Sequence, residues 1–177
     1  MVIFLGSANA IEMIFLDFHI HSKYARAVSK DSDLIHLANG AKAKGLNVIG
    51  TGDFFHPKWQ QELKENLEPF DESGLFKFKS EKTPSILFML QNEIASVNTQ
   101  GGKGRRVHHV LTCKSFEELN QLTESFLKIG RVDYDGRPIF GMSCSQVVET
   151  CKNVSKDAHI VPAHAWTPWF GVFGSKS

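Results

Sequence analysis

The chain has 177 residues, of which 42% are hydrophobic and 22% charged, a composition that indicates a globular protein and excludes a disordered one. Lysine and arginine number 20 against 19 acidic residues, so no overall charge drives the chain towards nucleic acid or a membrane surface. No apolar run approaches the ~18 residues of a membrane span, and three widely spaced cysteines favour a cytoplasmic protein over a disulfide-bonded one.

Runs of branched and aromatic residues alternate with helical patterns along the chain. Residues 1–12 precede the first strand pattern, and we expect them to form an extension outside the fold. Strands are predicted over residues 13–20, 46–53, 84–93, 105–112 and 158–164. Helices are predicted after a cap at Asp31 or Ser32, over 56–69, over 116–129 behind a capping box at Ser115, and from Ser143 to about Asn153.

The alternation of strands with helices is typical of an α/β architecture with a mostly parallel sheet. In such folds the functional side chains gather where strands end. Here every predicted strand carries or ends in a histidine or a carboxylate, the ligand types that Zn²⁺, Mn²⁺ and Fe accept. These residues are His19, His21, Asp53, Glu93, His108, His109 and His164.

The histidine pair His19-Ile20-His21 ends the first predicted strand. Residues i and i+2 of a strand point to the same side, about 6.5–7 Å apart at Cα, so two imidazoles can converge on one cation. A single H-x-H motif is only a weak indication of metal binding. Its repetition at successive strand ends predicts a shared metal site.

The segment EIASVNTQGGKGRRVHHV (93–110) has two glycines at its centre and predicts a β-hairpin. With the turn between Gly101 and Gly102, Glu93 faces Val110 and shares a face with His108, its diagonal neighbour. A shift of one residue in register would favour His109 as the ligand instead. We prefer His108.

Three further segments have two interpretations each. GGKGRR (101–106) either binds phosphate or forms a solvated turn, and it contains Lys103, Arg105 and Arg106. AWTPWF (165–170) either stacks on a nucleobase through Trp166 and Trp169 or packs beneath a loop. His56 is either a metal ligand or the first residue of a helix.

Taken together, these motifs resemble the polymerase-and-histidinol-phosphatase (PHP) family of metal-dependent phosphoesterases. The resemblance rests on H-x-H, GTGD, the third-strand Glu93, VHHV and VPAH, and it runs from residue 13 to the last residue. Within that family, the endonuclease Q branch is similar to four longer stretches: FHIHSKYARAVSK (18–30), GTGDFFHPKW (50–59), YDGRPIFG (134–141) and VPAHAWTPWFGVFGSKS (161–177).

The resemblance implies a distorted (β/α)7 barrel with its metal ions at the C-terminal ends of the strands. About five of the seven strands are recognisable, and the late Asp-x-His of the family is not found. Residues 13–177 are therefore expected to form a partial PHP domain that lacks its C-terminal strands, with the missing C-terminal part of the same protein as its partner. A membrane is not an expected partner.

The resemblance also implies a ligand set. His19, His21 and Glu93 would hold one metal ion, and Glu93 would bridge to a second ion held by His108 and His164. Asp53 matches an acidic family residue whose usual histidine neighbour is replaced here by Phe54. The implied cofactors are two or three divalent ions, with zinc expected first and Mn, Mg or Fe as alternatives.

The implied activity is nicking of DNA on the 5′ side of deaminated bases, or at abasic sites, by a water activated between two metal ions. Glu93 and Asp53 would be the catalytic residues. The expected substrate contacts are Lys103, Arg105, Arg106, Trp166 and Trp169. A small-molecule phosphatase of the histidinol-phosphatase type and an inactive metal-binding fragment are alternatives, and we expect residues 1–177 alone to be weakly active or inactive.

Overall fold

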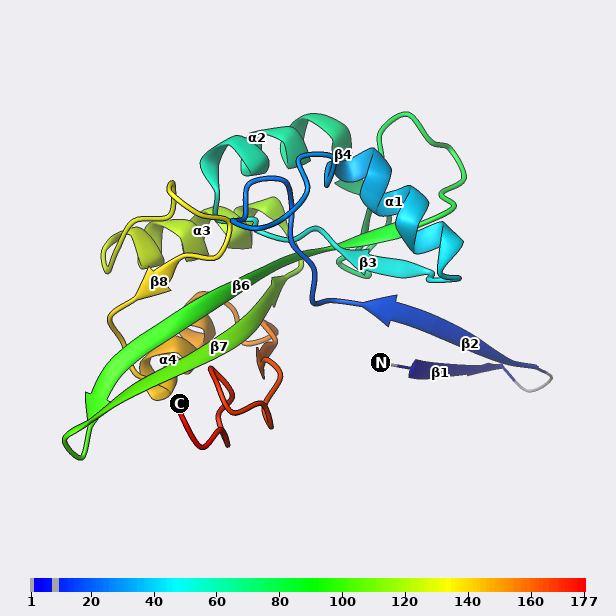
Figure 1. The fold of residues 1–177 in the computed structure, drawn as a ribbon. Helices are drawn as coiled ribbons and strands as arrows, with labels where there is room; N and C mark the ends of the chain where they lie inside the picture. The colour runs from blue at the N-terminus through cyan, green and yellow to red at the C-terminus, as the bar shows by residue number, and fades with distance from the viewer. Residues whose placement is uncertain (1, 8–9) are drawn as a thin grey trace.

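The computed structural model describes residues 2–7 and 10–177, with side chains described from Met13 onward (Figure 1). Nine strands and four helices lie in these residues and form a mixed α/β fold around an open sheet. The strands are β1 (Val2–Ser7), β2 (Ala10–Asp17), β3 (Val48–Gly50), β4 (Leu67–Pro69), β5 (Phe76–Phe78), β6 (Leu87–Gln100), β7 (Lys103–Cys113), β8 (Ile139–Phe140) and β9 (Ile160–Pro162). The helices are α1 (Leu34–Ala43), α2 (Pro57–Asn66), α3 (Phe116–Leu127) and α4 (Cys144–Val154).

The centre of the sheet is parallel, but its larger part is not. Strands β2, β3 and β6 pair in parallel, and β8 adds to β6 in the same direction. The pairs β1–β2, β4–β5, β5–β6, β6–β7 and β7–β9 are antiparallel, so the prediction of a mostly parallel sheet is wrong. The reason is local, because β6 and β7 are joined by the tight turn Gly101-Gly102 and need no helical crossover. The (β/α)7 barrel, of which about five strands were expected in this chain, stays a prediction.

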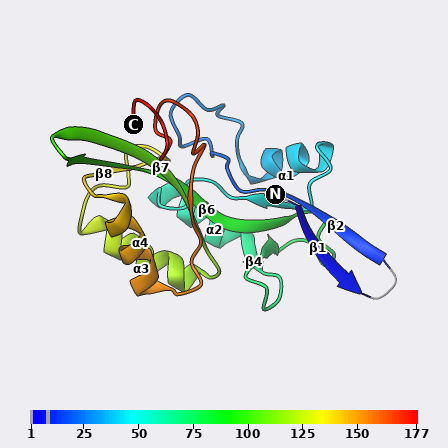
Figure 2. The same cartoon turned by 90° about the horizontal axis from the view of Figure 1, so that it is seen from below.

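A two-stranded arm and a long hairpin extend from opposite ends of the fold. The first predicted strand continues back to Ala10, and residues 10–15 pair with β1. Figures 1 and 2 show this arm projecting on one side and the β6–β7 hairpin on the other. The expectation that residues 1–12 lie outside the fold stays a prediction, and residues 1, 8 and 9 lie outside the described ones.

Local side-chain hydrogen bonds decide where the helices begin. Helix α1 starts after Asp33 and not after Asp31 or Ser32, because the Asp33 carboxylate accepts the His36 N–H. The predicted capping box at Ser143 is confirmed at the start of α4. The box at Ser115 is only half formed at α3, because the Glu118 carboxylate accepts the Lys114 N–H instead of the Ser115 N–H.

An aromatic core fixes the loop that follows β3. Phe54 and Phe55 are fully buried and stack edge-to-face, and Phe55 also contacts Phe126 and Phe140. Burying two phenylalanines directly after Asp53 anchors that residue at the edge of the core. None of the helices in the described ranges is long and apolar enough to cross a membrane.

Candidate metal centre

His19 and His21 lie in the segment that follows β2, outside the strand itself. The strand ends at Asp17, whose carboxylate accepts the His19 N–H at 3.0 Å and shapes the turn. The strand predicted over residues 13–20 thus ends at Asp17, and strand spacing does not apply to this pair. Both imidazoles nevertheless reach one carboxylate, that of Glu93, because the turn directs them to the same side.

Glu93 lies in the middle of β6 and is 1% exposed. Its Oε1 atom is 3.1 Å from His19 Nε2, 2.9 Å from His108 Nδ1 and 3.3 Å from His164 Nε2. Its Oε2 atom is 3.0 Å from His21 Nε2. The structure thus brings together five of the predicted ligands, from four separate segments of the chain.

The distances around Glu93 Oε1 fit a metal ion better than a set of hydrogen bonds. No imidazole N–H is aligned with this buried oxygen, although three ring nitrogens lie within 3.3 Å of it. In a tetrahedral site with ligand bonds of ~2.0–2.1 Å, neighbouring ligand atoms are about 3.3 Å apart. The ligand atoms of His19, Glu93 and His164 all lie within 4.8 Å of one another. The residues present can therefore hold a divalent ion.

The β6–β7 register places His108 and not His109 in this group. Glu93 pairs with Val110, as the sequence predicted. His108 then faces Glu93, whereas the His109 ring contacts Ser96 Oγ at 3.0 Å on the opposite face. Two adjacent histidines thus have different surroundings.

His164 reaches the site from the loop after β9. Its Nε2 atom is 3.2 Å from His108 Nδ1, and its ring stacks on that of His19 with the centroids 5.7 Å apart. Thr167 Oγ1 lies 3.0 Å from the other ring nitrogen, Nδ1. His164 has a positive φ of 32°, so its position depends on this turn.

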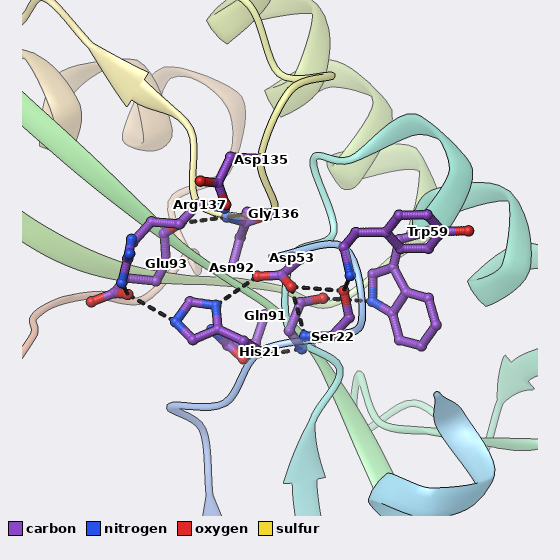
Figure 3. Close-up of polar contacts among 12 residues, drawn as sticks. His21, Ser22, Asp53, Trp59, Gln91, Asn92, Glu93, Asp135, Gly136 and Arg137 are labelled. Carbon is purple, nitrogen blue, oxygen red and sulfur yellow. Dashed lines mark hydrogen bonds and ion pairs between the residues drawn. The ribbon is translucent and has the colours of Figure 1, made fainter. Parts of the chain in front are cut away.

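Asp53 lies behind His21 and not beside the Glu93 group (Figure 3). Its Oδ1 atom is 2.8 Å from His21 Nδ1, and its Oδ2 atom accepts the backbone N–H and the hydroxyl of Ser22 at 2.6 and 2.7 Å. Asp53 is fully buried and has a φ of 45°, following Gly52 at 67°. On this geometry the carboxylate orients an imidazole, and its predicted role as a metal ligand stays a prediction.

Close contact between two loops explains the positive φ angles of Gly52 and Asp53. A Cβ at Gly52 would lie 3.0 Å from the His21 backbone, so only glycine lets the β3 loop approach the β2 loop. The indole N–H of Trp59 donates to the carbonyls of Thr51 and Gly52 and holds this turn. The sequence GTGD therefore acts through its backbone as well as through its carboxylate.

The protonation of the cluster is strongly coupled. Burial raises the pKa of Glu93, but the imidazoles of His108, His19 and His21 outweigh it and hold the pKa well below its usual range. Burial lowers the pKa of His21, yet hydrogen bonds to Asp53 and Glu93 raise it to about 9. Without a metal ion, His21 is thus a proton-bearing bridge between two carboxylates.

Two neighbours of the cluster were missed from the sequence. Arg137 Nη1 lies 3.3 Å from Glu93 Oε2. Phe170 stacks on the His108 ring with the centroids 4.3 Å apart. Both residues lie in stretches that resemble endonuclease Q, and that resemblance was the available signal.

The predicted substrate residues lie outside the cluster. The basic ones are on the exposed part of β7, where Lys103 is five residues, or about 17 Å of strand, from His108. Trp166 and Trp169 are 81% and 55% exposed, so they do not pack beneath a loop. These two side chains are therefore accessible from the solvent.

His56 is not one of the residues around Glu93. It precedes α2 as the cap residue, and its ring stacks on Tyr24 with the centroids 4.3 Å apart. Of its two interpretations, the structure favours the start of a helix.

No protein-family model matches the chain. An uncharacterised protein of Methanocaldococcus jannaschii is 30% identical over 154 residues, which are 86% of this chain and 16% of that protein. The crystal structure of PfuEndoQ, a lesion-specific endonuclease from Pyrococcus furiosus, matches with a TM-score of 0.75 and 30% identity. A second structure, of endonuclease Q with a 27-mer duplex substrate carrying an abasic lesion at the active site, matches with a TM-score of 0.74 and 33% identity.

These matches cover 90% and 89% of this chain, which spans 36% of the length of each solved protein. Over about nine tenths of its length, the chain resembles endonuclease Q, an enzyme of the PHP family.

Proposed function

We propose that this chain carries the metal centre of an endonuclease that nicks damaged DNA on the 5′ side of deaminated bases or at abasic sites. The observation that carries the proposal is the buried Glu93 carboxylate with four imidazole nitrogens 2.9–3.3 Å from its oxygens. The similarity to two endonuclease Q structures supports DNA as the substrate.

The ligands divide around the two carboxylate oxygens of Glu93. His19, His108 and His164 lie at Oε1, and His21 lies at Oε2. The predicted division, with His19 and His21 at one ion and His108 and His164 at the other, stays a prediction. A pair of divalent ions held there would supply a hydroxide nucleophile and neutralise charge on the phosphate. Glu93 would hold the ions, and Asp53 would keep His21 in the required orientation.

The exposed aromatic and basic side chains favour DNA over a small phosphate ester as the substrate. Trp166 and Trp169 offer accessible aromatic faces in the loop that also positions His164. Stacking on such faces stabilises an unpaired base by ~1–3 kcal/mol. We infer that Lys103, Arg105 and Arg106, on the exposed part of β7, contact phosphates further along the DNA strand.

The test uses labelled duplexes that contain one deoxyinosine, one deoxyuridine, one abasic site or no lesion. The whole protein is incubated with each duplex in Mn²⁺, Mg²⁺ or Zn²⁺ and in EDTA. We expect one nick on the 5′ side of each lesion, and none in EDTA or in the undamaged duplex. Equal cutting of all four duplexes, or hydrolysis of phosphate monoesters alone, would reject the proposal.

A further inference from the structure

Arg137 is a cation beside the buried Glu93 carboxylate (Figure 3). Its Nη1 atom is 3.3 Å from Glu93 Oε2. The Arg137 side chain is 37% exposed, whereas that of Glu93 is 1% exposed. The guanidinium therefore reaches the centre and still has N–H groups available to a ligand that arrives from outside.

The backbone around Arg137 is held by hydrogen bonds from its own loop and from two distant segments. Asp135 Oδ1 accepts the Arg137 N–H at 3.1 Å. Asn92, which precedes Glu93 in β6, donates from Nδ2 to the Gly136 carbonyl at 3.1 Å. The Gly136 N–H in turn donates to the Tyr24 carbonyl, next to the Ser22 loop. Such fixation reduces the conformational entropy that Arg137 would lose on binding a ligand.

The charges of the centre favour an anion at this position. One divalent ion would outweigh the single negative charge of Glu93, and Arg137 adds a further positive charge. A metal ion bound by Glu93 would also compete with Arg137 for Oε2, because both are cations. The guanidinium would then lack a partner, and its planar N–H groups match the oxygens of a phosphate.

We propose that Arg137 binds a non-bridging oxygen of the phosphate that is cut. In the protein without metal ions it pairs with Glu93, and once an ion takes that carboxylate the freed guanidinium binds the phosphate. The inference rests on the proposed function for the identity of the substrate. It requires only a phosphate group for its test.

The test compares Arg137→Gln and Arg137→Lys with a control, Arg131→Gln. Arg131 lies in the same loop, but it is 74% exposed and pairs with Asp133 away from the centre. The whole protein is loaded with Mn²⁺, and three quantities are measured: bound metal, the affinity for inorganic phosphate, and the kinetics of nicking an abasic duplex.

We expect Arg137→Gln to weaken phosphate binding at least 10-fold and to lower kcat/KM about 100-fold. Arg137→Lys should recover part of the phosphate affinity, because it keeps the charge without the planar geometry. Bound metal should stay the same or rise, because a competing cation is removed from Glu93. Arg131→Gln should match the wild type in all three measurements.

The outcomes separate this inference from the proposed function. Unchanged phosphate affinity and nicking in Arg137→Gln would overturn the inference and leave the endonuclease proposal intact. Loss of bound metal in Arg137→Gln would also overturn it, because Arg137 would then act by supporting Glu93. If the wild type nicks no DNA but binds phosphate through Arg137, the endonuclease proposal fails and the inference stands.

Discussion

The Asp53 carboxylate holds the His21 ring from behind, with Oδ1 2.8 Å from Nδ1, while the opposite ring nitrogen faces Glu93 at 3.0 Å. The second oxygen of Asp53 is engaged by Ser22. A carboxylate that accepts the outer N–H of an imidazole fixes its tautomer and makes the inner nitrogen a better ligand. The structure thus connects a residue of the β3 loop with the centre through an imidazole.

Asp53→Asn tests this connection. The amide lacks the charge, and it offers an N–H where His21 or Ser22 requires an acceptor, so we expect metal affinity to fall about 10–100-fold. Metal content after dialysis, followed by a metal titration, measures the change. Asp157→Asn is the control, since Asp157 is 70% exposed and pairs with Lys114 on the surface. Equal affinity in both variants would show that Asp53 does not position His21.

Gly136→Ala tests the same carboxylate from its other side. A Cβ at position 136 would overlap the Asp53 carboxylate, whereas one at Gly141 would meet no atom within 4 Å. We expect Gly136→Ala to weaken metal binding and to lower the free energy of unfolding by about 1–3 kcal/mol. Gly141→Ala should leave metal binding unchanged. Urea denaturation and metal titration of the two variants provide the comparison, and identical behaviour would contradict it.

His108→Gln and His109→Gln test the hairpin register. His108 faces Glu93 Oε1 at 2.9 Å, whereas the His109 ring faces Ser96. We expect His108→Gln to lose at least one bound metal ion per chain and His109→Gln to retain the wild-type content. Elemental analysis measures the number of bound ions per chain in each variant. Metal loss in His109→Gln alone would mean that the register in solution is shifted by one residue.

Trp166→Ala tests the exposed aromatic face. The side chain is 81% exposed and its ring stacks on the exposed Phe173 with the centroids 4.6 Å apart, so its removal should lower the melting temperature only slightly. If it stacks on the damaged base, the affinity for a duplex with one deoxyinosine should fall by ~1–3 kcal/mol. The salt dependence of binding should stay the same, because no charge is removed. Phe70→Ala, which removes a 40% exposed aromatic at the end of β4, should change neither property, and equal DNA affinity in both variants would refute the stacking role.

The metal-free protein should lose stability in acid through His109. Burial, with a smaller contribution from the charge of His108, lowers the pKa of His109 to about 4 from the ordinary 6.5. The unfolded chain therefore binds this proton first as the pH falls. The contribution to stability is complete above pH 6.5 and declines towards pH 4, by about 3 kcal/mol in all. Urea midpoints at pH 7 and 4.5 measure it, and His109→Gln should show a smaller change between the two values.

The sequence by itself determined which residues meet. Glu93 and four histidines were recognisable as candidate ligands because H-x-H, VHHV and VPAH recur along the predicted strands, although Glu93 and His108 lie inside long strands and not at their ends. The register of the β6–β7 hairpin was also predictable, since two adjacent glycines define the turn and the turn defines every pair. Glu93 opposite Val110 is the result.

Only the tertiary structure decided how those residues are used. That Asp53 lies behind His21, that Arg137 covers Glu93, and that Trp166 faces the solvent all depend on loops packed against one another. The sequence also could not predict whether the outer strands are parallel or antiparallel, because hydrophobic periodicity indicates which residues of a strand are buried and not the direction of the neighbouring strand. Local sequence patterns mark the candidate ligands. The packing of Phe54, Phe55 and Trp59, which are distant in sequence from most of these candidates, sets where the side chain of Asp53 lies.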